Sequence, residues 1–123
     1  MKRRLLLPIA LGAGALALVA QTQAMSAPKL IGTVGPGFTI SLKDGTGHKV
    51  TSLKAGKYTF VVTDKASIHD FVLEKTKGGS FEKHITSVGG TGKKTVTVNL
   101  TKGKWKVYCK PHESSMFGFF TVS

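Results

Sequence analysis

Short stretches of alternating apolar and polar residues dominate the chain after its first two dozen positions. The clearest are 58–63 and 94–100, where β-branched and aromatic residues recur with a period of two. Two further stretches, 69–74 and 104–109, alternate in the same way. A period of two is the signature of a half-buried β-strand, and no long helical periodicity accompanies it.

Glycine-rich turn signals separate these stretches and divide the chain into elements of similar length. We expect about seven or eight short strands, near residues 29–34, 38–42, 49–53, 57–64, 69–75, 93–100, 103–109 and 117–122. Short strands at regular spacing favour an antiparallel sandwich or barrel, so the predicted fold class is all-β. The stretch 76–91 shows little alternation and is expected to form a long, exposed crossover.

The first 24 residues follow a different pattern. A basic start, Lys2 to Arg4, precedes an apolar run over 5–20 and a polar segment that ends at Ala24. This is typical of a secretory signal peptide, and the apolar run is short for a membrane span. We therefore expect a signal peptide over 1–24, one folded domain over 25–123, and a periplasmic or extracellular location. An uncleaved N-terminal tether remains an alternative, and the paired arginines leave general secretion and twin-arginine export both open.

The charge that remains beyond residue 24 comes from lysine alone. This part of the chain holds 15 lysines and no arginine against 6 acidic residues, a net charge of +9. Nucleic-acid readers rely on the bidentate contacts of arginine, so we expect no nucleic-acid partner. The charge is better suited to solubility and to attraction of an acidic partner or an anionic surface, and we expect a monomer.

The residues that carry chemistry gather near the C-terminus. Cys109, His112 and Met116 are spaced C-x2-H-x3-M on an expected loop between two strands, and His69 heads an upstream strand. One thiolate, two imidazoles and one thioether form the ligand set of a blue-copper site. Cys109 is the chain's single cysteine, which excludes a disulfide within the chain.

The remaining candidates have other expected roles. His48 and His84 lie in turn-rich or polar contexts, so we expect both to be exposed and not to bind metal. Trp105 alternates in register with the cysteine and is expected in the core. A Cys-His hydrolase is disfavoured because no third orienting group is evident, and a binuclear copper centre would need two cysteines.

The chain resembles small cupredoxins of the plastocyanin, pseudoazurin and amicyanin kind. The segments that carry the resemblance cover nearly the whole chain after residue 24: 37–40, 58–60, 67–71, 108–112, and Met116 with 118–122. The resemblance implies a Greek-key β-sandwich with one copper ion at one end. By the same resemblance, the implied ligands are His69, Cys109, His112 and, as the axial thioether, Met116.

Two positions depart from the family pattern. Asp70 stands where the family usually has Asn, whose side chain ties the two ligand loops together. An ionised Asp accepts hydrogen bonds and donates none, and its charge favours Cu(II) and a lower reduction potential. The gap of three residues between His112 and Met116 is the azurin-type spacing, one shorter than is common beside C-x2-H.

The expected function is therefore that of a type 1 copper electron-transfer protein outside the cytoplasm, and not that of an enzyme. The alternative is an exported copper-binding or delivery protein without an electron-carrier role. The resemblance further implies an apolar patch around His112, with Pro111 and Phe117 as members, at which a redox protein docks. Lysines around the patch would favour a partner with an acidic docking surface.

Overall fold

The structure is a computed structural model, and it describes residues 12, 14 and 26–123. The predicted signal peptide over 1–24 lies outside the described residues apart from Gly12 and Gly14. Among the described residues, no helix is long and apolar enough to cross a membrane.

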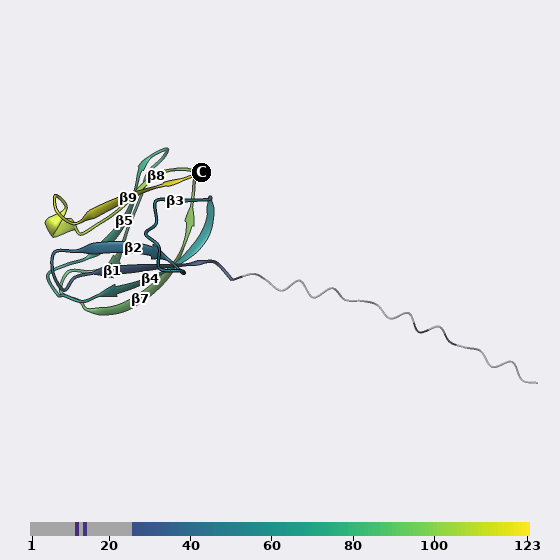
Figure 1. Cartoon of the computed structure of the whole chain (residues 1–123), viewed down its shortest axis with the longest axis horizontal. Helices are drawn as coiled ribbons and strands as arrows, with labels where there is room; N and C mark the ends of the chain where they lie inside the picture. Colours follow the sequence, from purple (N-terminus) through teal and green to yellow (C-terminus); the bar gives the residue numbers. More distant parts are fainter. Residues whose placement is uncertain (1–11, 13, 15–25) are drawn as a thin grey trace, which may run out of the picture.

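Two β-sheets face each other in this part of the chain (Figure 1). The nine strands are β1 (Lys29–Val34), β2 (Ile40–Asp44), β3 (Ser52–Leu53), β4 (Gly56–Asp64), β5 (Phe71–Lys77), β6 (Phe81–Thr86), β7 (Gly92–Leu100), β8 (Gly103–Tyr108) and β9 (Phe117–Val122). Sheet A has the order β2-β1-β4-β7, and sheet B has the order β3-β9-β8-β5-β6. The predicted all-β Greek-key sandwich is confirmed, with nine strands where seven or eight were expected.

Strand β6 is the element that the sequence pattern missed. It lies inside the stretch 76–91 that was expected to be a crossover, and it pairs with β5 at the edge of sheet B. Its first four residues are exposed and only Ile85 and Thr86 are buried, so it lacks the apolar alternation of an inner strand. The expected strand over 49–53 is also wrong in extent, because only Ser52–Leu53 form β3.

The core consists of the inward-facing residues of both sheets. Its largest fully buried apolar side chains are Trp105, Phe60, Phe71, Leu30, Leu73, Leu100 and Met116. Trp105, at 1% exposure, takes the core position predicted for it. Gly32 on β1 leaves the space into which the ring of Phe71 reaches from the opposite sheet.

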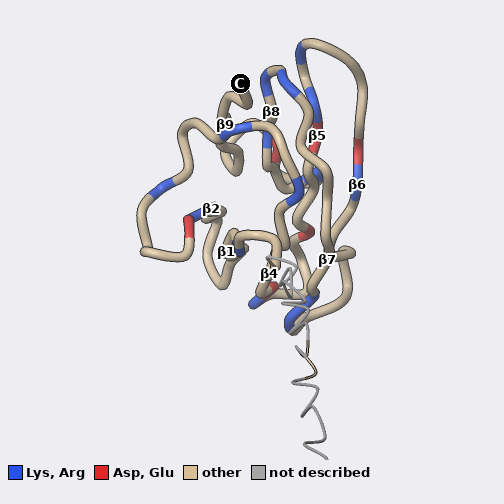
Figure 2. The backbone as a smooth tube through the Cα atoms, turned by 90° about the vertical axis from the view of Figure 1, so that its right-hand side faces the viewer, with Lys and Arg blue, Asp and Glu red and all other residues tan. Residues whose placement is uncertain are grey.

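The loops at one end of the sandwich bring the candidate ligands together. These are the β1–β2 loop, the β4–β5 loop, and the β8–β9 loop with its 3-10 helix η1 (Lys110–His112). The C-terminus lies at the other end (Figure 1). Lysines are spread along the whole fold, whereas the acidic residues are few (Figure 2).

Candidate metal centre

The β8–β9 loop is folded tightly by its own backbone. The Cys109 N–H donates to the Met116 carbonyl (3.0 Å), and the Met116 N–H donates to the His112 carbonyl (2.8 Å). The His112 N–H donates in turn to the Cys109 carbonyl (3.1 Å). Pro111 suits the first turn of η1, because a proline has no N–H to lose there. The spacing C-x2-H-x3-M thus encloses one compact loop, as expected.

His69 lies in the β4–β5 loop, two residues before β5 and not at the head of the strand. Buried Asp64, at the end of β4, accepts hydrogen bonds from the Ala66 N–H (3.1 Å) and the Thr86 hydroxyl (2.9 Å). The Thr86 Oγ1 also accepts the N–H of Phe71, the first residue of β5 (2.9 Å). These bonds hold both ends of the loop, so the position of His69 is set by β4, β5 and β6 together.

The orientation of the His69 ring follows from one hydrogen bond. Its Nε2 lies 2.9 Å from the carbonyl oxygen of Gly37, and a carbonyl can only accept. Nε2 therefore carries the proton, and Nδ1 presents its lone pair to the interior. A second-sphere bond of this kind is the usual means by which a protein fixes a metal-binding histidine.

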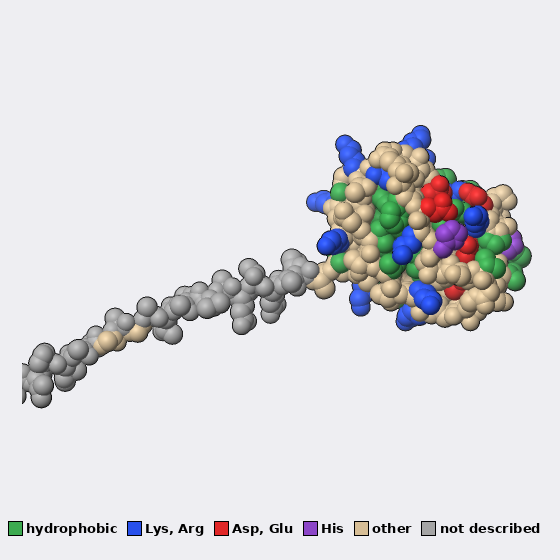
Figure 3. Space-filling view, turned by 180° about the vertical axis from the view of Figure 1, so that it is seen from behind, with side chains coloured by type: hydrophobic (Ala, Val, Ile, Leu, Met, Phe, Trp, Pro, Cys, Tyr) green, Lys and Arg blue, Asp and Glu red, His purple; other side chains and the backbone are tan. Residues whose placement is uncertain are grey.

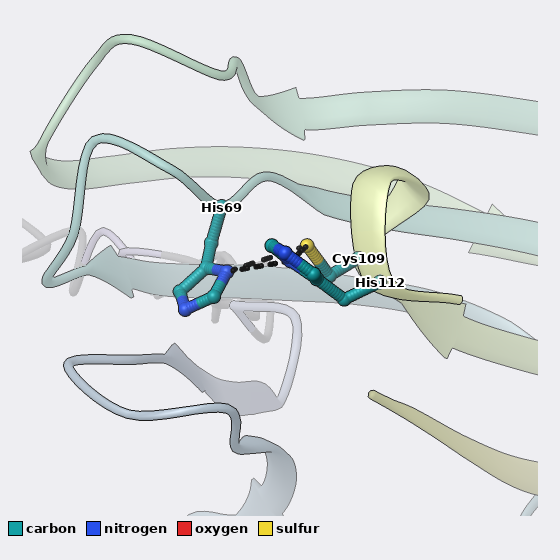
Figure 4. A group of neighbouring side chains, drawn as sticks. All are labelled: His69, Cys109 and His112. Carbon is teal, nitrogen blue, oxygen red and sulfur yellow. Dashed lines mark hydrogen bonds between the residues drawn. The ribbon is translucent and has the colours of Figure 1, made fainter. Parts of the chain in front are cut away.

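The three donor atoms converge (Figure 4). The Cys109 Sγ lies 3.6 Å from the Nδ1 of His69 and 3.6 Å from the Nδ1 of His112, and the two Nδ1 atoms are 3.2 Å apart. Cys109 and His69 are fully buried, whereas His112 is partly exposed. Of the three convergent residues, His112 is therefore the one that reaches solvent.

Met116 belongs to the same loop and is 1% exposed. Its backbone carbonyl accepts the Cys109 N–H, so the two residues lie opposite each other at the base of the loop. Met116 is also part of the hydrophobic core cluster.

Burial raises the pKa of the Cys109 thiol above its ordinary value. The thiolate is the form that binds metal, so binding displaces a proton from a group that holds it firmly. The metal must therefore be one with high affinity for sulfur.

Asp70 ties the two ligand loops together in spite of the departure from the family pattern. Its Oδ1 accepts the Lys110 N–H at 2.7 Å, and the side chain is buried. Lys110 directly follows Cys109 and Asp70 directly follows His69. The tie needs only an acceptor, which a carboxylate supplies.

Phe38 is the site residue that sequence reasoning missed. Its ring stands edge-to-face against both imidazoles, with centroids 5.5 Å from His69 and 4.9 Å from His112. It is nevertheless 60% exposed. The expected strand over 38–42 is shifted, because β2 begins at Ile40, so Phe38 lies in the β1–β2 loop that reaches the histidines.

The two histidines outside the site, His48 and His84, are both exposed, as expected. The side chain of His84 is 41% exposed and also contacts Asp70.

The donor set fits copper. A thiolate and two neutral imidazoles with a buried thioether nearby match the soft ligands of a type 1 site, and a hard cation would need oxygen ligands. A buried site that places these donors before metal arrives restricts the geometry that either oxidation state can adopt. The residues present thus suit one type 1 copper ion.

Solved structures with a similar fold include reduced rusticyanin, with a TM-score of 0.58 and 17% identity over 82% of each chain. Rusticyanin from Thiobacillus ferrooxidans has a TM-score of 0.51 and 21% identity, over 81% of this chain and 79% of that one. Auracyanin A, a blue copper protein from the green thermophilic photosynthetic bacterium Chloroflexus aurantiacus, has a TM-score of 0.53 and 15% identity, over 80% of this chain and 100% of its own.

No curated protein matches the sequence. The family described as copper binding proteins of the plastocyanin/azurin family matches residues 18–123, which includes every strand and all four candidate ligands. With the sandwich, the convergent thiol and imidazoles, and this match over most of the sequence, the chain belongs to the plastocyanin/azurin family of copper-binding proteins.

Proposed function

We propose that this chain is a mobile one-electron carrier that works outside the cytoplasm, with His69, Cys109, His112 and Met116 as its copper ligands. The observation that carries the proposal is the convergence of a buried thiol and two imidazole Nδ1 atoms within hydrogen-bonding distance. When bound, copper supplies one-electron exchange between Cu(II) and Cu(I). No substrate is transformed, so the proposed role is not that of an enzyme.

The protein's part in this role is to hold the ligands still. The Gly37 carbonyl fixes the His69 ring, and the Asp70 carboxylate binds the segment after Cys109. These bonds join three loops, so a shift of the His69 ring or of the backbone after Cys109 would break a hydrogen bond. Small rearrangement between oxidation states is what makes electron exchange fast.

His112 is the proposed route for electrons, since it is the one partly exposed member of the three convergent residues. Exposed apolar side chains share its end of the fold: Phe38, Ile68, Pro111 and Phe117. Such a surface sheds water on contact and lets a partner approach the imidazole closely. Exposed lysines at the same end are Lys65, Lys93, Lys94 and Lys110, which supports an acidic redox partner.

Export remains part of the proposal and rests on the sequence of residues 1–24. We propose that this segment directs the chain to the periplasm or beyond, and that 25–123 acts there as a monomer, either free or tethered to the membrane. The net charge of +9 on that part of the chain supports attraction to acidic proteins or anionic surfaces.

Copper titration of the metal-free protein tests the proposal. Cu(II) should produce intense visible absorption from thiolate-to-copper charge transfer that saturates at one ion per chain. Cys109→Ser should abolish the band, whereas His48→Gln, a change at an exposed histidine away from the site, should leave it intact. A band that persists in the serine variant would refute the assignment.

The electron self-exchange rate separates carrier from delivery protein. Fast exchange between oxidised and reduced copies is expected of a carrier. Slow exchange, or a bound ion that cannot be reduced reversibly, would favour the copper-delivery alternative.

A further inference from the structure

His84 occupies an unusual position on the outer face of sheet B. Its Nδ1 lies 3.3 Å from the Asp70 Oδ2, and its Nε2 lies 3.2 Å from the Glu82 Oε1. A neutral imidazole has one N–H, whereas an imidazolium has two. Only the protonated form of His84 can therefore donate to both carboxylates at once.

Asp70 connects this histidine to the metal centre. One oxygen of its buried carboxylate accepts the Lys110 N–H, and the other faces His84. Asp70 directly follows His69 in the chain, and its carboxylate contacts both the backbone after Cys109 and the solvent-exposed side chain of His84. A change of charge on His84 acts on Asp70 across one contact of 3.3 Å, and the Asp70 end of that contact is buried, where screening by water is weaker than in bulk solvent.

The surroundings of His84 are acidic although the chain as a whole is basic. The titratable and charged groups around it are Asp70 from the β4–β5 loop, Glu82 on β6, Glu74 on β5, and Tyr108 and Lys106 on β8. Glu82 accepts the Tyr108 hydroxyl at 3.2 Å, and Lys106 pairs with Glu113 at 2.7 Å. Figure 3 shows acidic side chains beside a histidine on this face. Because Lys106 is already paired with Glu113, His84 is the group that can supply a positive charge between the carboxylates of Asp70 and Glu82.

We propose that His84 is a proton-linked positioning residue that sets the reduction potential of the bound copper through Asp70. Protonation of His84 offsets the negative charge beside the site and raises the potential; loss of that proton lowers it. In the coupled step, a redox partner supplies one electron that converts Cu(II) to Cu(I), and solvent supplies the proton that binds the His84 imidazole. The inference rests on the proposed copper role of the site.

The linkage must be reciprocal. If a proton on His84 favours Cu(I), then Cu(I) favours a proton on His84 by the same factor. A tenfold difference in proton affinity between the two oxidation states corresponds to about 59 mV for a one-electron couple. The pH range concerned is that in which histidines change charge, between about pH 5 and 8.

The first test is the reduction potential as a function of pH for four proteins. In the native protein the potential should fall as pH rises through the titration of His84. His84→Gln should lose that part of the profile, and His84→Lys, with a fixed positive charge, should hold a high potential across the range. His48→Gln is the matched control, because His48 also lies near a carboxylate, Asp44, but on the β2 hairpin; its profile should equal the native one.

The second test needs no copper. In the metal-free protein, the NMR titration of the His84 imidazole should move to lower pH in Asp70→Asn, which keeps an acceptor for the Lys110 N–H but removes the charge. An unchanged titration would overturn the coupling.

The two failures are distinguishable. If the copper-loaded protein lacks the blue absorption, both the proposed function and this inference are refuted. A blue protein in which His84→Gln has the native pH profile would overturn the inference alone.

Discussion

Tyr108 and Cys109 are neighbours in sequence whose side chains face opposite sides of sheet B, and both resist ionisation. Burial raises the pKa of the Cys109 thiol. Burial, followed by the negative charges of Glu82 and Glu74, raises the pKa of the Tyr108 phenol. Both groups are therefore held in their neutral forms by the folded chain.

Alkaline pH should destabilise the metal-free protein for this reason. Above the ordinary pKa values of 9.0 for the thiol and 10.0 for the phenol, the unfolded chain loses protons that the folded chain keeps. Their contribution to stability is thus complete below about pH 9 and is lost as pH rises, by at most about 1.4 kcal/mol per pH unit for each group. Urea unfolding at several pH values measures it. The double variant Cys109→Ser/Tyr108→Phe should show a shallower decline; an equal decline would contradict this account.

The metal-site residues differ in how far sequence alone could place them. Cys109 and His112 could be grouped because they share a short loop, and the structure brings them together. The contacts of Phe38 and His84 could not be foreseen, because they join loops and strands that are far apart in sequence. Asp70 was seen as a departure, but which N–H it accepts depends on the folded backbone.

At the scale of elements, the loop that carries His69 depends on one hydroxyl. Thr86 accepts the Phe71 N–H and donates to Asp64, and no described buried side-chain N or O lacks a partner. Thr86→Val should leave both groups unpaired, at a cost of about 1–3 kcal/mol in the free energy of unfolding. Thr86→Ser keeps the hydroxyl and is the control. Equal stability of the valine and serine variants in urea would contradict the role assigned to Thr86.

The approach of the two sheets depends on Gly32. A Cβ at this position would lie 2.9 Å from the Phe71 ring and 2.9 Å from the Val62 Cγ2. Gly32→Ala should therefore overpack the core and cost about 1–3 kcal/mol. Gly45→Ala is the matched control, since its nearest neighbour would be the Lys29 carbonyl at 3.9 Å, and its effect should stay within about 0.5 kcal/mol. Thermal unfolding of both variants decides the point.

Strands with a buried face were predictable, the edge strand β7 included, whereas the mostly exposed edge strand β6 was not. The expected strand over 117–122 coincides with β9, and 57–64 differs from β4 by one residue. In both strands, buried positions alternate with more exposed ones toward the C-terminal end, because one face packs into the core. β6 was not predicted because its first four residues are exposed, so its sequence has no alternation of apolar and polar residues.

At the scale of the whole molecule, charge should govern encounters. Two copies of residues 25–123, each with a net charge of +9, repel each other, and this repulsion reaches about 30 Å at 0.01 M salt but about 10 Å at 0.1 M. The electron self-exchange rate, measured by NMR line broadening, should therefore rise several-fold over that range. An acidic partner should show the opposite trend. A self-exchange rate that falls with added salt would contradict this electrostatic picture.

The shortness of β3 has a further consequence for the protein in concentrated solution. In the described part of the chain, β3 covers only Thr121 and Val122 of β9, which leaves the backbone of 117–120 open at the rim of sheet B. The unpaired backbone N–H and C=O groups of an edge strand can form hydrogen bonds with a strand of another copy. Lys43 and Lys49 line the groove beside this rim, where a second rim would bring more of the same charge. The positive charge of these lysines therefore opposes edge-to-edge pairing of two copies, and this repulsion weakens as the salt concentration rises.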